Sequence, residues 1–390
     1  MQVFVLILGL SVFVSLFANA GLKLFIWLRP LLSGVSPLIY GIAYGAVVVA
    51  VLGSFIISRI PDNGLPHILI AAGHYMLGFL VYLVMLVNIV DLLLFLGRII
   101  RLFPGSLPSQ VMLAAGGAVI LVAAGVSVYG AVHGLAIQTR SYEVQLRQAE
   151  GTDEGDILQI ALISDLHLGY IVDGKHLEKI VTAVNAASPD IVCIAGDIFD
   201  GDITSLEDDS KVQRLFGEFR APYGVYACLG NHDAGPGYEQ MQEFLSGAGV
   251  SVLQDEAVVI DGRFVLAGRR DSSPIGSQGD RRTELTLPAQ AENLPVIVLD
   301  HQPGNIGEYD AGTDLILCGH THRGQMFPFN LVTSAAFDVD YGYYQRPEDG
   351  VQVVVTSGAG TWGPPQRVAT DNEIVMIRAA LPAAGPAEMN

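Results

Sequence analysis

Four long apolar segments in the first third of the chain constrain its architecture more than any other feature. They cover residues 2–27, 37–58, 68–97 and 110–135. A bilayer core of about 30 Å requires roughly 20 apolar residues in a helix, and each segment reaches that length. Turn-forming sequences separate them, namely Arg29-Pro30, Pro61-Asp62-Asn63-Gly64 and Pro104-Gly105. We therefore expect an all-α bundle of about four transmembrane helices over residues 1–137.

Charge separates this region from the rest of the chain. Residues 1–137 contain five basic and two acidic residues, whereas residues 138–390 contain 16 basic and 37 acidic ones, a formal charge of −21. Nucleic-acid binding requires a basic surface, so no nucleic-acid partner is expected. The three cysteines, Cys193, Cys228 and Cys318, lie in apolar strand-like runs and are interpreted as core residues.

The distribution of basic residues around the apolar segments favours one orientation. An external globular part leaves four basic residues in the cytoplasm, namely Lys23, Arg29, Arg98 and Arg101. The opposite orientation leaves three there, Arg59, Arg140 and Arg147. Since cytoplasmic loops are enriched in Lys and Arg, we expect a multi-pass cell-membrane protein whose globular part is extracytoplasmic.

A few polar residues interrupt the apolar segments. They are Lys23, His74, Asn88 and Asp91. An ionisable group at membrane depth is a functional candidate, and a transport role is one interpretation. We favour packing between helices, because Asn88 and Asp91 share one helical face and Lys23 and Asp91 lie near segment ends.

The acidic part reads as a polar linker over 138–156, a domain over 157–381 and an Ala/Pro/Gly-rich flexible tail over 382–390. Strand-like runs at 157–164, 191–195 and 224–229 alternate with helical patterns at 175–187, 207–219 and 237–247. Further strands follow at 257–260, 264–268, 295–300, 314–318, 351–357 and 373–378. This order predicts an α/β domain in which a second sheet packs on the first.

Polar side chains follow five of the predicted strands. They are Asp165 and His167, then Asp197 and Asp200, then Asn231, His232 and Asp233, then Asp300 and His301, and finally His320 and His322. The carboxyl ends of parallel strands meet at one edge of a sheet, so these groups are expected to converge. Carboxylate, imidazole and amide ligands without thiolate suit Mn, Fe or Zn. About seven ligands exceed the need of one metal, and Asp197 is the natural bridge between two.

These blocks resemble the signature of the calcineurin-like metallophosphoesterases. That signature is Asp-x-His, Gly-Asp-x-x-Asp, Gly-Asn-His-Asp, a single His and Gly-His-x-His, and all of it occurs in order within residues 157–325. The resemblance implies a four-layer αββα sandwich with two divalent metal ions. It further implies that Asp165, His167, Asp197 and His322 hold one metal, while Asp197, Asn231, His301 and His320 hold the other.

The resemblance also implies a mechanism, in which a metal-bound hydroxide attacks phosphorus in line. His232 would stabilise the transition state or protonate the leaving oxygen, with Asp233 or Asp200 orienting it. The bound cations would dominate the local field, so an acidic domain can still accept a phosphate.

Other sequences resemble the membrane-anchored or exported bacterial branch of that family. They are Ala221-Pro222-Tyr223-Gly224-Val225-Tyr226, His320 to Gln325, Ser357 to Gly360, and Pro364-Pro365-x-Arg367. The branch commonly has acidic residues after its glycine near position 268, where this chain has Arg269 and Arg270. Arg269 is therefore a candidate contact for a second phosphate or a lipid headgroup, or part of a solvated charge cluster. Arg323 and Arg367 are further candidate substrate contacts.

The sequence thus predicts a membrane-anchored, two-metal phosphoesterase that hydrolyses a phosphoester or pyrophosphate bond. A lipid-linked substrate is attractive, since four helices exceed what tethering needs. One alternative is a non-catalytic membrane sensor with a vestigial metal site, which the intact ligand set disfavours. Another is a transporter with an appended phosphatase domain, which the sparse membrane charges disfavour.

Overall fold

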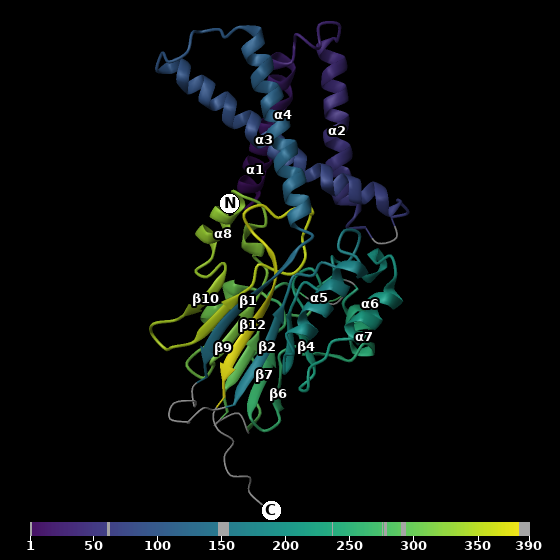
Figure 1. Cartoon of the computed structure of the whole chain (residues 1–390), viewed down its shortest axis with the longest axis vertical. Coiled ribbons are helices and arrows are strands. Elements are labelled where there is room, and N and C mark those ends of the chain that lie inside the picture. Colours follow the sequence, from purple (N-terminus) through teal and green to yellow (C-terminus); the bar gives the residue numbers. More distant parts are fainter. Residues whose placement is uncertain are drawn as a thin grey trace, which may run out of the picture. The chain divides into compact units, whose positions relative to one another are not determined.

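The chain forms two compact units in a computed structural model (Figure 1). The structure describes residues 2–60, 63–146, 156–235, 237–274, 276, 279–289 and 294–381. One unit comprises the residues up to Ile60, Gly64–Ala131 and Gly363–Gln366, and the other comprises the rest. The predicted flexible tail over 382–390 and most of the second half of the predicted linker lie outside the described residues.

The first unit contains four helices, α1 (Gln2–Trp27), α2 (Pro37–Ile57), α3 (His67–Ile99) and α4 (Ser109–His133). Each is long and apolar enough to cross a membrane. The prediction of four long apolar helices is confirmed, with boundaries within about two residues. Local chemistry sets the start of α2, where the Ser36 hydroxyl accepts the Ile39 N–H at 3.1 Å and Pro37 occupies the first turn.

Polar groups of the helices bind one another. Lys23 Nζ of α1 lies 2.8 Å from Asp91 Oδ1 of α3, and Asn19 Nδ2 donates to Asn88 Oδ1 at 3.0 Å. This pairing joins α1 to α3 and satisfies groups that hydrocarbon cannot solvate. It supports the interpretation that these residues serve helix packing.

The second unit contains two six-stranded sheets. The first has the order β1 (Ile137–Gln145), β12 (Asn372–Ala380), β2 (Ile157–Ile163), β3 (Ile191–Ala195), β4 (Val225–Cys228) and β5 (Val250–Val252). The second has the order β10 (Gly342–Gln345), β11 (Gln352–Val355), β9 (Leu315–Cys318), β8 (Val296–Leu299), β7 (Phe264–Gly268) and β6 (Glu256–Ile260). Strands β2 to β5 are parallel to one another, as are β7, β8, β9 and β11.

Apolar layers stack the sheets and helices. Helices α5 (Gly174–Ala186), α6 (Asp209–Phe216) and α7 (Tyr238–Gly247) cover the outer face of the first sheet (Figure 1). Leu162 and Cys193 of that sheet face Leu266 and Leu299 of the second across a buried layer. The outer face of the second sheet is covered by the 3₁₀ helix η3 (Pro303–Glu308) and nearby loop residues. The predicted layered α/β sandwich is confirmed, and the three cysteines are buried free thiols.

The prediction of a polar linker over residues 138–156 is wrong for its first half. Residues 137–145 form β1, which pairs in parallel with β12 from Ile137 opposite Asn372 onward. Only Val144 in this strand is buried, because β1 is the edge of its sheet. Its exposed positions tolerate polar residues, and the resulting composition resembles that of a linker. The short strands β5 and β10 and the helix α8 (Phe329–Ala336) were also not predicted.

Candidate metal centre

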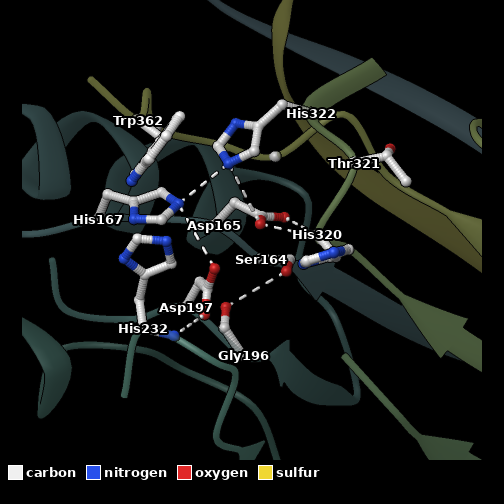
Figure 2. Close-up of polar contacts among 12 residues, drawn as sticks. Ser164, Asp165, His167, Gly196, Asp197, His232, His320, Thr321, His322 and Trp362 are labelled. Carbon is white, nitrogen blue, oxygen red and sulfur yellow. Dashed lines mark hydrogen bonds and ion pairs between the residues drawn. The ribbon is translucent and has the colours of Figure 1, made fainter. Parts of the chain in front are cut away.

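The predicted strand-end residues meet where parallel strands end. Asp165 and His167 follow β2, Asp197 and Asp200 follow β3, and Asn231, His232 and Asp233 follow β4. His301 follows β8 of the second sheet, and His320 and His322 follow β9. The two sheets pack face to face, so their carboxyl ends bring both sets of side chains into one cluster (Figure 2).

An unusual backbone conformation turns these side chains inward. Asp165, His167, Asp197, His320 and His322 have φ values of 53°, 46°, 51°, 73° and 50°. Non-glycine residues rarely adopt this left-handed region, which costs on the order of 1–3 kcal/mol per residue. Five such residues in one cluster indicate that the surrounding fold imposes the geometry of the site.

Two glycines leave the space that the cluster occupies. A Cβ atom on Gly230 would lie 2.2 Å from Asp197 Oδ1, and one on Gly319 would lie 1.9 Å from Ser164 Oγ. No side chain fits at either position without displacing the loops. Close approach of the backbone therefore explains the glycines of the Gly-Asn-His and Gly-His-x-His sequences.

The first group of possible ligand atoms comes from Asp165, His167 and His322. These atoms all lie within 4.8 Å of one another. His167 Nε2 is 3.0 Å from His322 Nε2, which in turn is 3.4 Å from Asp165 Oδ1. Figure 2 shows these imidazoles and the carboxylate pointing toward one another.

A second group consists of Asp197, His301 and His320, again within 4.8 Å. His301 Nε2 lies 3.2 Å from Asp197 Oδ2, and the same oxygen lies 3.7 Å from His167 Nε2 of the first group. The Asp197 carboxylate thus lies between the two groups. Asn231 follows β4 beside them, and its Oδ1 is buried.

The residues present fit divalent cations. The buried Asn231 Oδ1 has no hydrogen-bond partner among the residues that the structure describes. Buried polar atoms are normally satisfied, so an unpaired acceptor among carboxylates and imidazoles fits a cation. The donors are carboxylate, imidazole and amide without thiolate, a set that suits Mn, Fe or Zn.

For Asp197, His320 and His322 the surroundings favour the protonation states of metal ligands, whereas burial raises the pKa of Asp165 and, against the effect of burial, the Asp197 carboxylate raises the pKa of His301. Burial alone would raise the pKa of Asp197, but His301 and His167 hold it below its ordinary value. Burial and the neighbouring His301 lower the pKa of His320 to about 4. Burial and His167 lower the pKa of His322 well below its ordinary value. The carboxylate is therefore charged, and the two imidazoles are neutral with a lone pair to donate.

His232 lies at the exposed side of the cluster. Its backbone N–H donates to Asp197 Oδ1 at 2.9 Å, and its Nδ1 lies 3.4 Å from Asp200 Oδ1. The His232 ring lies 4.8 Å from the His167 ring and 5.7 Å from that of Trp362, measured between centroids. Sequence reasoning missed Trp362, although this residue closely follows the Ser357-Gly358-Ala359-Gly360 motif. The Trp362 ring lies edge to face with the His232 ring (Figure 2).

Comparison with known proteins decides the family. A model of the calcineurin-like phosphoesterase family matches residues 158–324. An Aquifex aeolicus protein described as an uncharacterized metallophosphoesterase is 31% identical over 238 residues, which cover 59% of this chain and 88% of the relative. This chain belongs to the calcineurin-like phosphoesterase family.

Other relatives share the domain in different contexts. Phosphodiesterase YaeI of Escherichia coli is 30% identical over 194 residues, covering 47% of this chain and 67% of the relative. A Danio rerio transmembrane protein with metallophosphoesterase domain is 29% identical over 271 residues, covering 66% of this chain and 61% of the relative. The chain spans about three fifths of the length of the Danio relative and of a Helicobacter pylori relative. The chain therefore combines a metallophosphoesterase domain with four helices that are long and apolar enough to cross a membrane.

Within this metallophosphoesterase site, Asp233 lies differently from the sequence interpretation. Its fully buried carboxylate accepts N–H groups from Ile198 at 3.1 Å, Phe199 at 2.9 Å and Gly230 at 2.9 Å. Asp233 therefore holds the loops after β3 and β4 together. Of the two carboxylates predicted to orient His232, only Asp200 lies beside its ring.

The structure also corrects the interpretation of Arg367 as a substrate contact. The side chain is completely buried, and it donates to His322 O at 3.0 Å, Ser357 O at 2.7 Å and Gly360 O at 2.6 Å. Its Nε also donates to Asn372 Oδ1 at 2.6 Å. A guanidinium whose donors are occupied by buried carbonyls supports the loops of the site and is not placed to contact a substrate phosphate.

The other two candidate substrate contacts differ from each other. Arg269 is buried and its Nη1 lies 3.0 Å from the Asp255 carboxylate, so it belongs to a buried ion pair. That pairing corrects both sequence interpretations, the substrate contact and the solvated cluster. Arg323 is half-buried and lies over the Tyr341 ring at 4.3 Å, directly after the ligand candidate His322. Of the three, Arg323 stays a candidate substrate contact.

Proposed function

We propose that this protein is a membrane-anchored, two-metal hydrolase of a phosphoester or pyrophosphate bond. The observation that carries the proposal is the position of Asp197. One of its oxygens lies 3.2 Å from His301 and 3.7 Å from His167, each a member of a separate group of ligand atoms. A carboxylate between two such groups suits a shared ligand of two cations.

We assign the ligands to two metal sites, with Mn, Fe or Zn as the candidate ions. Asp165, His167, Asp197 and His322 would hold one ion, and Asp197, Asn231, His301 and His320 the other. When bound, the ions supply charge that polarises the phosphoryl group and activates water. Residues behind the ligands fix their orientation: His301 Nδ1 donates to Ala195 O at 2.8 Å, which directs Nε2 toward Asp197.

His232 is the candidate for proton transfer. Its Nδ1 faces the Asp200 carboxylate at 3.4 Å, a contact that orients the ring. From the exposed side of the cluster, the ring would stabilise the phosphoryl transition state or give its Nε2 proton to the leaving oxygen. Water contributes the oxygen of the new bond to phosphorus, and the bond from phosphorus to the leaving oxygen breaks.

The anchoring also bears on location and substrate. The distribution of Lys and Arg between the loops supports an extracytoplasmic catalytic domain. The last helical residue of α4, His133, precedes the first strand residue, Ile137, by only four positions. A catalytic domain joined so closely to a membrane helix has lipid phosphates within reach, which supports a lipid-linked substrate.

The test is hydrolysis of bis-p-nitrophenyl phosphate by the purified full-length protein supplied with Mn. We expect Asp197→Asn to lower kcat/KM by at least about 1,000-fold, because both metal sites lose the shared anionic carboxylate. We expect His232→Gln to lower kcat by about 100-fold to 10,000-fold while leaving bound metal unchanged. Glu178→Gln, at an exposed surface pair with Lys211, is the control and should keep full activity.

Two outcomes would contradict the proposal. Activity that survives in both Asp197→Asn and His232→Gln would remove the assigned site. A parent protein that binds Mn and hydrolyses none of a panel of phosphomonoesters, phosphodiesters and lipid pyrophosphates would instead favour the sensor alternative.

A further inference from the structure

Helix α8 and Phe327, two positions before it, expose an unusual apolar surface. We define the α8 surface as Phe327, Phe329, Leu331 and Val332, whose relative exposures are 48%, 42%, 59% and 61%. None of the eight residues of α8 is buried. Large side chains of this kind ordinarily face a core, so a contiguous exposed group of them marks an interaction site.

The charge of the surrounding sequence sharpens the contrast. Residues 326–336 contain no charged residue, although residues 138–390 have a formal charge of −21. A helix that faced water in so acidic a domain would be expected to contain charged positions. The α8 surface therefore suits a partner that is apolar and that does not require charge pairing.

The α8 surface is fixed to the candidate metal centre. The loop that contains His320 and His322 continues through the 3₁₀ helix η4 (His322–Gly324) directly toward α8. A Cβ atom on Gly324 would lie 2.2 Å from Asn330 N, so η4 and α8 touch through their backbones. At the other end of α8, the Phe337 ring lies 6.0 Å from the His320 ring. A partner that binds α8 is thus beside the ligand-bearing loop.

The short connection between α4 and β1 favours a lipid surface as the partner of the α8 surface. Only three residues separate α4 from β1, a span of about 10 Å when extended. This connection is also braced, since Asn372 Nδ2 donates to Gly134 O at 2.6 Å and His133 Nε2 lies 2.9 Å from Asp371 Oδ1. The domain is therefore tethered closely to α4, which is long and apolar enough to cross a membrane.

We propose that the α8 surface docks into the lipid interface and that the site acts on an amphiphile whose chains remain in the bilayer. Its phosphoester or pyrophosphate headgroup would reach the cluster beside α8. Water adds to phosphorus, the bond from phosphorus to the lipid-side or distal oxygen breaks, and that oxygen takes the proton. This inference rests on the proposed hydrolase function, but the docking can be measured without activity.

The first measurement is docking itself. The full-length protein is labelled with an environment-sensitive fluorophore at Val332→Cys and reconstituted into phosphatidylcholine and phosphatidylglycerol vesicles containing nitroxide lipids. The three native cysteines are buried. Leu287→Cys, at an exposed leucine of the same unit, is the control. We expect strong quenching at position 332 and little at position 287, as for a helix inserted about 5–10 Å into the interface.

The second measurement separates lipid from soluble substrates. We expect Leu331→Asp to lower hydrolysis of a lipid pyrophosphate in the same vesicles by at least about tenfold, the effect of about 1.4 kcal/mol of lost docking. Hydrolysis of soluble bis-p-nitrophenyl phosphate should stay unchanged. Leu287→Asp, which adds the same charge at another exposed leucine, should alter neither reaction.

The outcomes are distinct. Equal quenching at positions 332 and 287 would overturn the docking, as would efficient self-crosslinking of Val332→Cys in detergent, which would identify a second copy as the occupant. Unchanged lipid hydrolysis in Leu331→Asp would overturn the lipid-substrate step. Strong quenching at position 332 without hydrolysis of any ester would leave the docking standing and contradict the proposed function instead.

Discussion

Replacing Arg367 with methionine tests whether this residue supports the site or contacts the substrate. The guanidinium is buried and donates to Asn372, His322, Ser357 and Gly360. Burial lowers the pKa of Arg367 to about 10, against the opposing effect of Asp165 and Glu373, so the side chain is charged at neutral pH. Methionine fills a similar volume but offers no donor to these four acceptors.

The size of the effect follows from those acceptors. A buried acceptor left without a donor costs about 1–3 kcal/mol. Removal of the desolvated charge offsets part of the sum, and breaking a buried charged network typically costs about 3–5 kcal/mol. For a unit of this size, about 2–4 °C is lost per kcal/mol, so we expect Tm to fall by about 10 °C. Because Arg367 holds the backbone of His322, bound metal should decrease as well.

The assay is thermal unfolding of the purified full-length protein with Mn, together with metal content after dialysis. Arg323→Met is the matched control. Arg323 adjoins the same loop but is half-buried and contacts the Tyr341 ring at 4.3 Å, an interaction worth about 0.5–1 kcal/mol. Its substitution should lower Tm by only a few degrees.

A different result would restore the interpretation based on sequence. If Arg367→Met keeps its Tm and its metal but raises KM for soluble and lipid esters, the side chain contacts substrate. The supporting role would then be refuted, and the hydrogen bonds to His322, Ser357 and Gly360 would have little energetic weight.

Two further predictions concern the glycine beside Asp197 and the polar pair in the helices. Gly230→Ala should reduce activity by about 100-fold or more, since the new methyl group would lie 2.2 Å from Asp197 Oδ1. Gly235→Ala, whose Cβ would be 3.8 Å from the nearest atom, is the control. Equal activity of the two variants would contradict the steric argument. Asp91→Leu should destabilise the protein in detergent or lipid by about 1–3 kcal/mol, because it leaves Lys23 unpaired. Adding Lys23→Met to the same chain should restore most of the lost stability. Hydrolysis of the soluble ester should be unchanged in both variants. Stability measured by thermal aggregation checks the second prediction, and a double variant as unstable as Asp91→Leu would refute the pairing.

Much of the fold was predictable because its elements have strong periodic patterns. The four membrane helices are apolar over more than a full span, and their ends carry proline, glycine or charge. The central strands are buried on both faces, so they read as short apolar runs between turns. The chemistry-bearing residues follow these runs directly, and the parallel arrangement of the strands then brings them together.

The missed elements are those in which burial is weak. Strand β1 lies at a sheet edge and α8 buries none of its eight residues, so neither shows the contrast of apolar and polar positions on which periodicity depends. For β1 the stabilising contacts come from β12, more than 200 residues away. Such pairing is a tertiary effect that local sequence does not encode.

Adjacency in sequence was a poor guide to roles within the site. His232 and Asp233 are neighbours, yet the His232 ring faces the cluster while the Asp233 carboxylate binds three backbone N–H groups behind it. The direction of each side chain depends on the φ of its loop, and several ligand candidates lie in the left-handed region. A sequence motif predicts which residues gather at such a site. Whether a residue faces the metals or holds the loops is decided by backbone conformations that the whole fold imposes. Arg367 shows that a charged residue can serve entirely in the second role.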